Sequence, residues 1–363
     1  MNDSRVQHPH FTDLDILRGI ATIGIFIHHI SWRCGICNYI FSAFGDCFVA
    51  FFFILSGFLS TKSQQESGNA DALTIKSVAH HILSKISKLY PMYLLCYILA
   101  LTLSDSFEYI PTKVLLLNAT MLQSWIPYPS LYFSVNSVSW FVSAIMFCHL
   151  LLLPVLKLMN KYPQVFWTAA ILVYITYFIV IQYIPEEMTL PIIYISPVMQ
   201  FPAFLFGIIS FHIFNKASRY TSHNIGAAQL ICWLALIASL ALCCHVHPRY
   251  VFASYWWLVW GALIIVTAKA SMQKSSSCIA AKAMILMSKI SYPFFMLHTI
   301  VIAAYINLCQ DMEFASPVPL TIVITFTASI AASAITNRII NATWTTISTS
   351  LPLERRQTCI SLF

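Results

Sequence analysis

Arginine and histidine within an apolar segment are the residues of this sequence best suited to chemistry. The segment LDILRGIATIGIFIHHIS, residues 14–31, carries Arg18 near one end and His28 and His29 near the other. An arginine binds anionic groups, and a neutral imidazole can accept a proton or act as a nucleophile. Because charged groups in apolar surroundings are costly, they are candidates for function.

The spacing places Arg18 and His29 on one face of a helix. Eleven residues at about 100° each bring the two side chains within roughly 20° of one another, whereas His28 points roughly 80° away from Arg18. The same residues rise about 16 Å, so the two groups cannot touch but could contact two parts of one long ligand. The alternative is that Arg18 reaches lipid phosphates while His29 bonds to a carbonyl of the protein.

Two further motifs could belong to a binding site. Ser56 and Gly57, in FFFILSGFL, would let a second helix or a ligand approach the backbone closely, although such a pattern is more typical of helix packing. Lys85 and Lys88, in SKISKLYP, stand one helical turn apart and could hold phosphate groups. The alternative for this pair is the ordinary positive charge of a cytoplasmic loop.

The remaining candidates carry less information. His149 and His298 lie within apolar segments, where a single histidine is more often a packed hydrogen-bonding group, and Trp140 suits an interfacial aromatic belt. Cys34 and Cys37 are separated by two residues, but a metal site would need further ligands that the sequence does not show. We therefore predict no metal site.

The composition decides which kind of protein positions these residues. Charged residues make up 9% of the 363 residues and hydrophobic residues 59%, with a mean hydropathy of +0.75. A soluble domain has about 25% charged residues, so soluble, disordered and coiled-coil proteins are excluded. We predict an all-α polytopic membrane protein, and we attribute the formal charge of +7 to membrane topology rather than to a nucleic-acid partner.

Ten segments are long and apolar enough to span a bilayer. Residues 111–125 are apolar but short, which favours an interfacial or re-entrant helix, and the loop at about 62–89 has the pattern of an amphipathic helix on the inner membrane surface. The predicted organisation is a tail at 1–13, a membrane domain at 14–340 and a tail at 341–363. The spans are expected at 14–33, 44–61, 90–106, 138–157, 164–184, 197–214, 226–245, 250–268, 285–306 and 318–340.

The distribution of positive charge orients these spans. With ten spans and a cytoplasmic N-terminus, 17 of the 20 lysines and arginines fall on the inner side. Only Arg33, Lys113 and Arg249 fall in outer loops. Since positive residues gather in cytoplasmic loops, we predict that both termini are cytoplasmic.

Taken together, the motifs resemble those of acyltransferase family 3, the integral membrane acyltransferases. Arg18 and His29, not His28, fall on its arginine–histidine motif, and FFFILSGFL resembles its SGF segment. SKISKLYPMYL resembles its basic pair before a proline, and ISYPFFMLH, ending at His298, resembles a late motif. The resemblance covers residues 11 to about 340, and the segment SWF at Trp140 is most similar to the exopolysaccharide, capsule and O-antigen branch.

The sequence also departs from the family pattern. The basic pair is usually two arginines, whereas Lys85 and Lys88 keep the charge without the bidentate geometry. Some branches carry an acidic residue where this chain has Ala50, and some carry a glutamate after the outer tryptophan, where this chain has none. Mechanisms that require those carboxylates are not expected here.

The resemblance implies transfer of an acyl group, usually acetyl from acetyl-CoA, to a hydroxyl of a surface glycan or lipid-linked sugar. Arg18, Lys85 and Lys88 would bind the CoA phosphates, and His29 would act as the base or carry the acyl group; Ser56, Gly57, Trp140 and His298 would pack the helices or line a substrate channel. The family further implies a bacterial inner-membrane protein whose partners are membrane lipid and glycan-assembly proteins. Direct transfer and an acyl-histidine relay both remain open, as does an acyl donor such as succinyl-CoA.

Two other functions suit the same pattern. A transporter could also have ten spans with arginine and histidine inside them, although no repeat of two halves is visible. A non-catalytic partner in a glycan-assembly complex would use Arg18 and His29 for structure only. Turnover of acyl-CoA by purified protein would distinguish an enzyme from both.

The charge distribution predicts the outcome of a reporter-fusion experiment. Reporters fused after Lys62, Lys161 and Arg355 should be cytoplasmic, and reporters near Tyr128, Glu187 and Asp311 should be external. The physical reason is the strong bias of positive residues toward the cytoplasmic side. An external C-terminus would contradict the ten-span arrangement.

Overall fold

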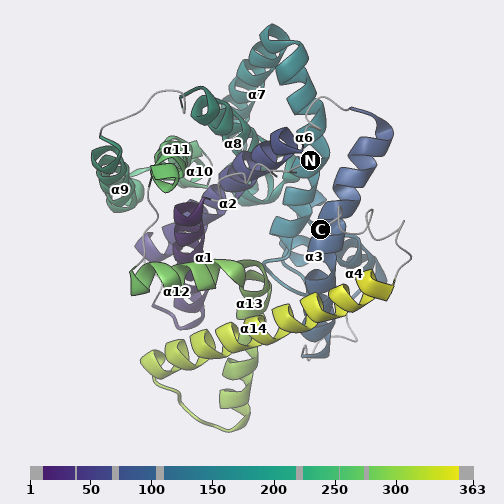
Figure 1. The fold of residues 1–363 in the computed structure, drawn as a ribbon. Coiled ribbons are helices and arrows are strands. Elements are labelled where there is room, and N and C mark those ends of the chain that lie inside the picture. Colours follow the sequence, from purple (N-terminus) through teal and green to yellow (C-terminus); the bar gives the residue numbers. More distant parts are fainter. Residues whose placement is uncertain are drawn as a thin grey trace.

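The protein is a bundle of helices. The computed structural model describes residues 11–36, 39–67, 73–103, 110–217, 224–252, 254–273 and 278–350, and this part of the chain contains no strand. Figure 1 shows α2 running through the middle of the bundle, α9 at its edge and the long α14 crossing one side. The helices are α1 (Thr12–Arg33), α2 (Tyr39–Glu66), α3 (Ile75–Thr102), α4 (Thr112–Ala119), α5 (Pro129–Tyr132), α6 (Trp140–Lys161), α7 (Pro163–Tyr183), α8 (Pro197–Ala217), α9 (Ile225–Leu242), α10 (Pro248–Val251), α11 (Trp257–Gln273), α12 (Ile279–Lys289), α13 (Ser291–Asp311) and α14 (Val318–Ser350).

The all-α, ten-span prediction is confirmed by the lengths and apolarity of these helices. Ten helical stretches among the described residues are long and apolar enough to cross a membrane, and each overlaps one predicted span. They are Thr12–Arg33, Ala43–Glu66, Ile75–Thr102, Trp140–Lys161, Pro163–Tyr183, Pro197–Ala217, Ile225–His245, Ser254–Met272, Ser291–Asp311 and Val318–Thr343.

The helix that contains the third predicted span begins well before that span. We expected a separate amphipathic helix before a span at residue 90, but α3 is continuous from Ile75 and passes through Pro91. Its start is fixed by a capping box, in which Thr74 and Ser77 exchange hydrogen bonds between side chain and backbone at 2.8 and 3.0 Å. The predicted amphipathic segment is therefore the first half of α3.

The ninth span begins later than predicted, because the expected helix at 285–306 is broken. The helix α12 ends at Lys289 and α13 begins at Ser291. Pro293 explains the break, since it has no N–H to bond to the carbonyl of Lys289 and its ring crowds that carbonyl. A proline is tolerated in the first turn of a helix, which is where Pro293 lies in α13.

The short apolar segment at 111–125 forms the eight-residue helix α4 and a turn of 3₁₀ helix, and neither is long enough to be a span. It is held between α3 and α6 by buried polar contacts. The Tyr93 hydroxyl donates to the carbonyl of Asn118 at 2.7 Å, and the Gln123 amide donates to Tyr93 at 3.2 Å and to Ser139 at 3.0 Å. This segment therefore packs as part of the bundle.

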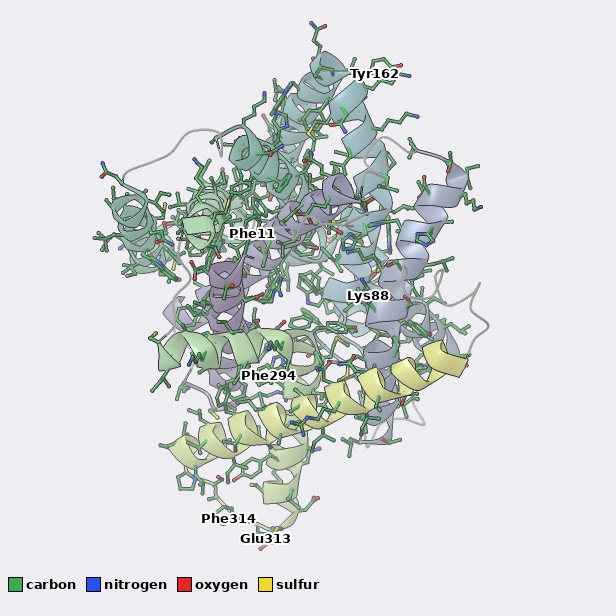
Figure 2. All side chains as sticks on the ribbon, in the orientation of Figure 1. Phe11, Lys88, Tyr162, Phe294, Glu313 and Phe314 are labelled. Atoms are coloured by element: carbon green, nitrogen blue, oxygen red, sulfur yellow. The ribbon has the colours of Figure 1, made fainter. Side chains whose placement is uncertain are left out.

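Segments predicted to lie on the same side of the membrane meet in the structure. On the predicted outer side, Arg249 donates to the carbonyls of Ile181 and Gln182 at 3.2 and 3.0 Å. On the predicted inner side, the Lys269 ammonium donates to the carbonyl of Ala217 at 2.9 Å. Figure 2 shows Tyr162, which joins α6 to α7, at one end of the molecule, and Glu313 at the opposite end.

Two glycines bring the backbones of α2 and α8 into direct contact. A Cβ atom on Gly57 would collide with the carbonyl oxygen of Phe204, and a Cβ atom on Gly207 would collide with that of Ile54. Helices in membranes approach closely where small residues face each other. Gly57 therefore serves the packing of α2 against α8.

We expect Gly57→Ala to lower the thermal stability of the purified protein. The new methyl group would push against a backbone carbonyl rather than a movable side chain, and overpacking of this kind costs about 1–3 kcal/mol. Gly226→Ala is the matched control, because nothing lies within 4 Å of the position that its Cβ would take. Equal unfolding temperatures for the two variants in detergent would contradict the predicted backbone contact.

Candidate active site

Two histidine rings from different helices meet inside the bundle. His29 of α1 and His298 of α13 have ring centroids 5.0 Å apart. His298 is fully buried, and its Nδ1 donates to the carbonyl oxygen of Phe294 at 3.0 Å. Because a carbonyl only accepts, the ring proton of His298 lies on Nδ1 and Nε2 carries a lone pair. That Nε2 atom has no hydrogen-bond partner among the described residues, so it is a buried proton acceptor.

The two adjacent histidines of α1 face different neighbours. Nδ1 of His28 lies 3.2 Å from the carbonyl oxygen of Phe41 on α2, and the ring occupies the space left open by Gly45. His29 instead contacts His298, with the His28 ring 4.8 Å from its own. Helical phase thus separates a histidine that packs against α2 from one that faces α13.

The segment 290–298 contacts two other motifs found in the sequence. The ring of Phe294 lies 5.9 Å from that of Phe26 on α1. Two residues earlier, the Tyr292 hydroxyl donates to the carbonyl of Leu89 on α3 at 2.7 Å. Figure 2 shows Phe294 and Lys88 in the middle of the molecule rather than at its ends. The start of α13 therefore joins the histidine segment of α1 to the basic segment of α3.

Aromatic rings connect the FFFILSGFL segment to the histidines. The ring of Phe53 lies 4.7 Å from that of Phe141 on α6, which lies 5.3 Å from Phe295 on α13. Phe295 in turn lies 6.2 Å from His298. This series of ring contacts connects α2 to the pair formed by His29 and His298.

Lys85 and Lys88 line a cleft of 580 Å³ formed by α2, α3 and α6. None of the described residues that line it is acidic, and several are serines. Neither lysine forms an ion pair within the described ranges, in contrast to Lys62, which pairs with Glu66 at 2.6 Å. A cleft with unpaired cations and hydroxyl groups suits an anionic ligand rich in oxygen atoms.

Ser56 and His149 lie next to this cleft. The Ser56 hydroxyl is 3.5 Å from Nε2 of His149, and the ring of His149 is 5.5 Å from that of His81. His149 is one turn along α6 from Leu153, which lines the cleft itself. Trp140 lies at the other end of α6, buried against Tyr194 with their rings 5.0 Å apart.

Arg18 is not brought together with the two lysines. Its guanidinium forms an ion pair with Asp15 at 3.1 Å, and it is absent from the described lining of the cleft. The continuous helix α1 keeps Arg18 and His29 on one face, as the spacing indicates. Asp15 lies three residues before Arg18, a helical spacing that allows an ion pair, and the sequence analysis did not predict this pair.

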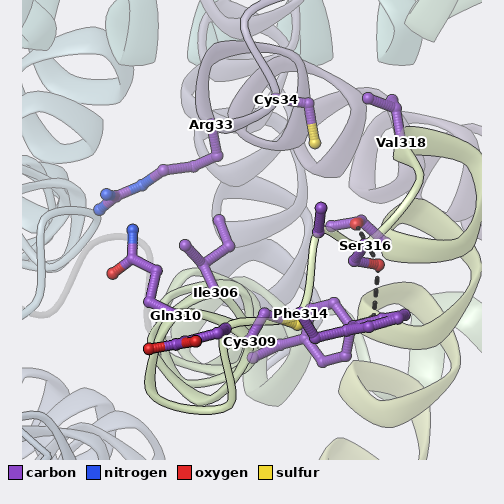
Figure 3. A pocket seen from close by; sticks show the side chains of 12 residues that line it. Arg33, Cys34, Ile306, Cys309, Gln310, Phe314, Ser316 and Val318 are labelled. Atoms are coloured by element: carbon purple, nitrogen blue, oxygen red, sulfur yellow. Dashed lines mark hydrogen bonds between the residues drawn. The ribbon is translucent and has the colours of Figure 1, made fainter.

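A second cavity, of 440 Å³, opens between the ends of α1 and α13 and the start of α14 (Figure 3). It is lined by Arg33, which follows His29 by one turn, and by Gln310 and Glu313. On its far side the hydroxyls of Tyr305 and Ser316 are 2.8 Å apart. This cavity lies on the seam between α1 and α13 that also holds the two histidine rings.

Two cysteines face this cavity, and neither forms a disulfide within the described residues. Cys34 and Cys309 line it as free thiols, whereas Cys37 lies outside the described residues. No group of three or more potential metal ligands was found in the described part of the chain. The structure therefore adds no candidate metal centre.

Asp46 is a buried acidic residue that the sequence analysis missed. It lies in α2 with 7% of its surface exposed, and its carboxyl group interacts with the Tyr194 side chain. An acidic residue inside the predicted span 44–61 was the available signal. It stands one turn before Ala50, on the same face of α2.

Residues 11–338 match a family model that is described as an acyltransferase domain, Acyl_transf_3. The chain belongs to acyltransferase family 3. The match spans most of the chain and includes every motif described above, so the protein is a multi-pass membrane acyltransferase. Comparison with curated proteins gave no match, and neither did comparison with solved structures.

We expect His29→Ala to slow acyl transfer about a hundredfold to ten-thousandfold, which is the usual contribution of a general base. His28→Ala should retain most of the activity per molecule, because its ring packs against α2. Acyl transfer should be measured per amount of protein in the membrane. Equal losses of activity in the two variants, together with lower protein levels, would mean that both rings serve packing only.

Proposed function

We propose that the protein transfers an acetyl group from acetyl-CoA to a hydroxyl of a cell-surface polysaccharide or lipid-linked sugar. It would act in the bacterial plasma membrane, with both termini in the cytoplasm. The observation that carries this proposal is the series of aromatic ring contacts that links α2, a helix that also lines the cationic cleft, to the His29–His298 pair. That arrangement suits a donor with an anionic end and a reactive end far apart.

The donor would bind with its phosphates in the cleft at Lys85 and Lys88. Ammonium groups that lack an ion pair make charge-assisted hydrogen bonds to phosphate oxygens without first losing another partner. The pantetheine arm would then pass along the rings of Phe141 and Phe295 toward the histidines. Arg18 is a second proposed cation for the donor, on the α1 side of the bundle, although it already pairs with Asp15.

His29 would act on the acceptor hydroxyl as a general base. As its imidazole takes the proton, the hydroxyl oxygen attacks the thioester carbonyl, and CoA leaves as a thiol that receives a proton. His298 supports this role, because its Nε2 lone pair can accept the N–H of the neighbouring ring and so orient it. In a relay, His29 would itself carry the acetyl group between donor and acceptor.

The acceptor would approach from the opposite end, through the cavity at Arg33. This cavity follows His29 by one turn of α1, and its amide, carboxylate and hydroxyl groups can pair with the hydroxyls of a sugar. The SWF segment at Trp140 favours the exopolysaccharide, capsule and O-antigen branch. The partners of the protein at the membrane would be glycan-assembly proteins and membrane lipid.

We expect Lys85→Ala combined with Lys88→Ala to raise the apparent KM for acetyl-CoA by about tenfold or more. Each charge-assisted contact contributes about 1.5–3 kcal/mol, and about 1.4 kcal/mol corresponds to a factor of ten. Arginine at both positions should be tolerated, since it keeps the charge and adds donors. The measurement is initial-rate kinetics with purified protein at several acetyl-CoA concentrations.

Lys161→Ala is the control for this experiment, because Lys161 lies on the predicted cytoplasmic side at the end of α6 but does not line the cleft. Its KM should equal that of the unchanged protein. A normal KM in the double variant would assign Lys85 and Lys88 to membrane topology alone. Absence of acyl-CoA turnover in the unchanged protein would contradict the proposed donor.

A further inference from the structure

His81 presents a buried hydrogen-bond donor to the cleft that holds Lys85 and Lys88. It is 7% exposed and lines the cleft directly. The amide nitrogen of Gln64 lies 3.2 Å from Nδ1 of His81, and an amide nitrogen can only donate. The ring proton therefore lies on Nε2, and this N–H has no partner among the described residues.

A buried N–H without a partner is uncommon and costs free energy. Here it occurs in a cavity of 580 Å³ whose other lining groups are cations and hydroxyls, among them Lys85, Lys88 and Ser84. No described residue gives this N–H an acceptor, and the described lining holds no carboxylate, so the place is open to a ligand or to water. The charges around the cleft favour a ligand that is an anion.

The His81 ring is held in a fixed orientation by two other helices. Gln64 of α2 occupies Nδ1, and the ring of His149 on α6 stands against it in a T-shaped contact with centroids 5.5 Å apart. His149 is itself held by the Ser56 hydroxyl at 3.5 Å. A donor fixed in this way loses little conformational entropy when a ligand binds.

We propose that His81 donates its Nε2–H to a phosphate oxygen of the acyl-CoA donor. This inference rests on the proposed function and adds a binding residue to the two lysines. Lys85 follows His81 by one turn on the same face of α3, so it supplies the positive charge beside the same group. His81 is neutral in this role, and it selects by the direction of its hydrogen bond rather than by charge.

Two amide substitutions separate ligand binding from internal packing at this position. In His81→Gln the amide nitrogen reaches the place of Nε2, so the donor toward the cleft is kept. In His81→Asn the amide reaches only the place of Nδ1, so the contact with Gln64 is kept and the donor toward the cleft is lost. His81→Phe keeps the ring contact with His149 and loses both polar atoms.

The experiment uses the full-length protein in detergent and two probes, acetyl-CoA and adenosine 3′,5′-bisphosphate. The second probe carries phosphates but no pantetheine arm and no acyl group. We expect His81→Asn and His81→Phe to weaken binding of the bisphosphate by about tenfold or more, with a matching rise in the KM for acetyl-CoA and kcat within about twofold. His81→Gln should stay within about threefold of the unchanged protein.

The reverse order, with His81→Asn near normal and His81→Gln impaired, would overturn the inference and leave His81 with a packing role. Normal binding in all three variants would overturn it too, with water as the partner of Nε2. If the unchanged protein binds the bisphosphate in a His81-dependent way but turns over no acyl-CoA, the phosphate site stands and the proposed donor fails. Thermal unfolding of each variant identifies any variant that is misfolded. Either His81→Asn or His81→Phe is sufficient for the comparison with His81→Gln.

Discussion

Polar groups within an apolar bundle have no bulk water to bond to, so each needs a partner from the protein or from a ligand. Many buried polar groups of the described residues follow that rule, as the contacts of Tyr93 and Tyr292 show. The exceptions among the described residues include the buried nitrogens of His81, His149 and His298, together with side-chain atoms of Asn118, Gln123, Tyr132, Thr189, Arg249 and Thr267. The three histidines lie beside the cationic cleft and in the histidine pair, which are the two places assigned to the ends of the proposed donor.

The start of α13 is what unites these two places. Its break from α12 at Ile290 lets Tyr292 reach α3, while Phe294 and His298 reach α1 within the next two turns. A continuous helix through this region would keep the orientation of α12, which packs along α1 at Gly19. One proline at position 293 therefore has a structural consequence for both the basic segment and the histidine segment.

The sequence predicted the ten spans and the separation of His28 from His29, because both depend on local apolarity and helical period. It did not predict where α3 begins, since a capping box at Thr74 and an amphipathic turn look the same for a surface helix and for an extended span. Nor could spacing show that Arg18 would stay apart from Lys85, or that His81 and Gln64 would meet across the cleft. Those facts depend on contacts between helices that are distant in the chain.

The backbone contact between α2 and α8 also determines which parts of the bundle can move. Separating those helices at Gly57 and Gly207 would break contacts along the most buried span, whereas few residues of α3 are fully buried. Local opening is easiest where few apolar contacts are lost. Opening of the bundle at the cleft would therefore lose fewer apolar contacts on the side of α3 than on the side of α2.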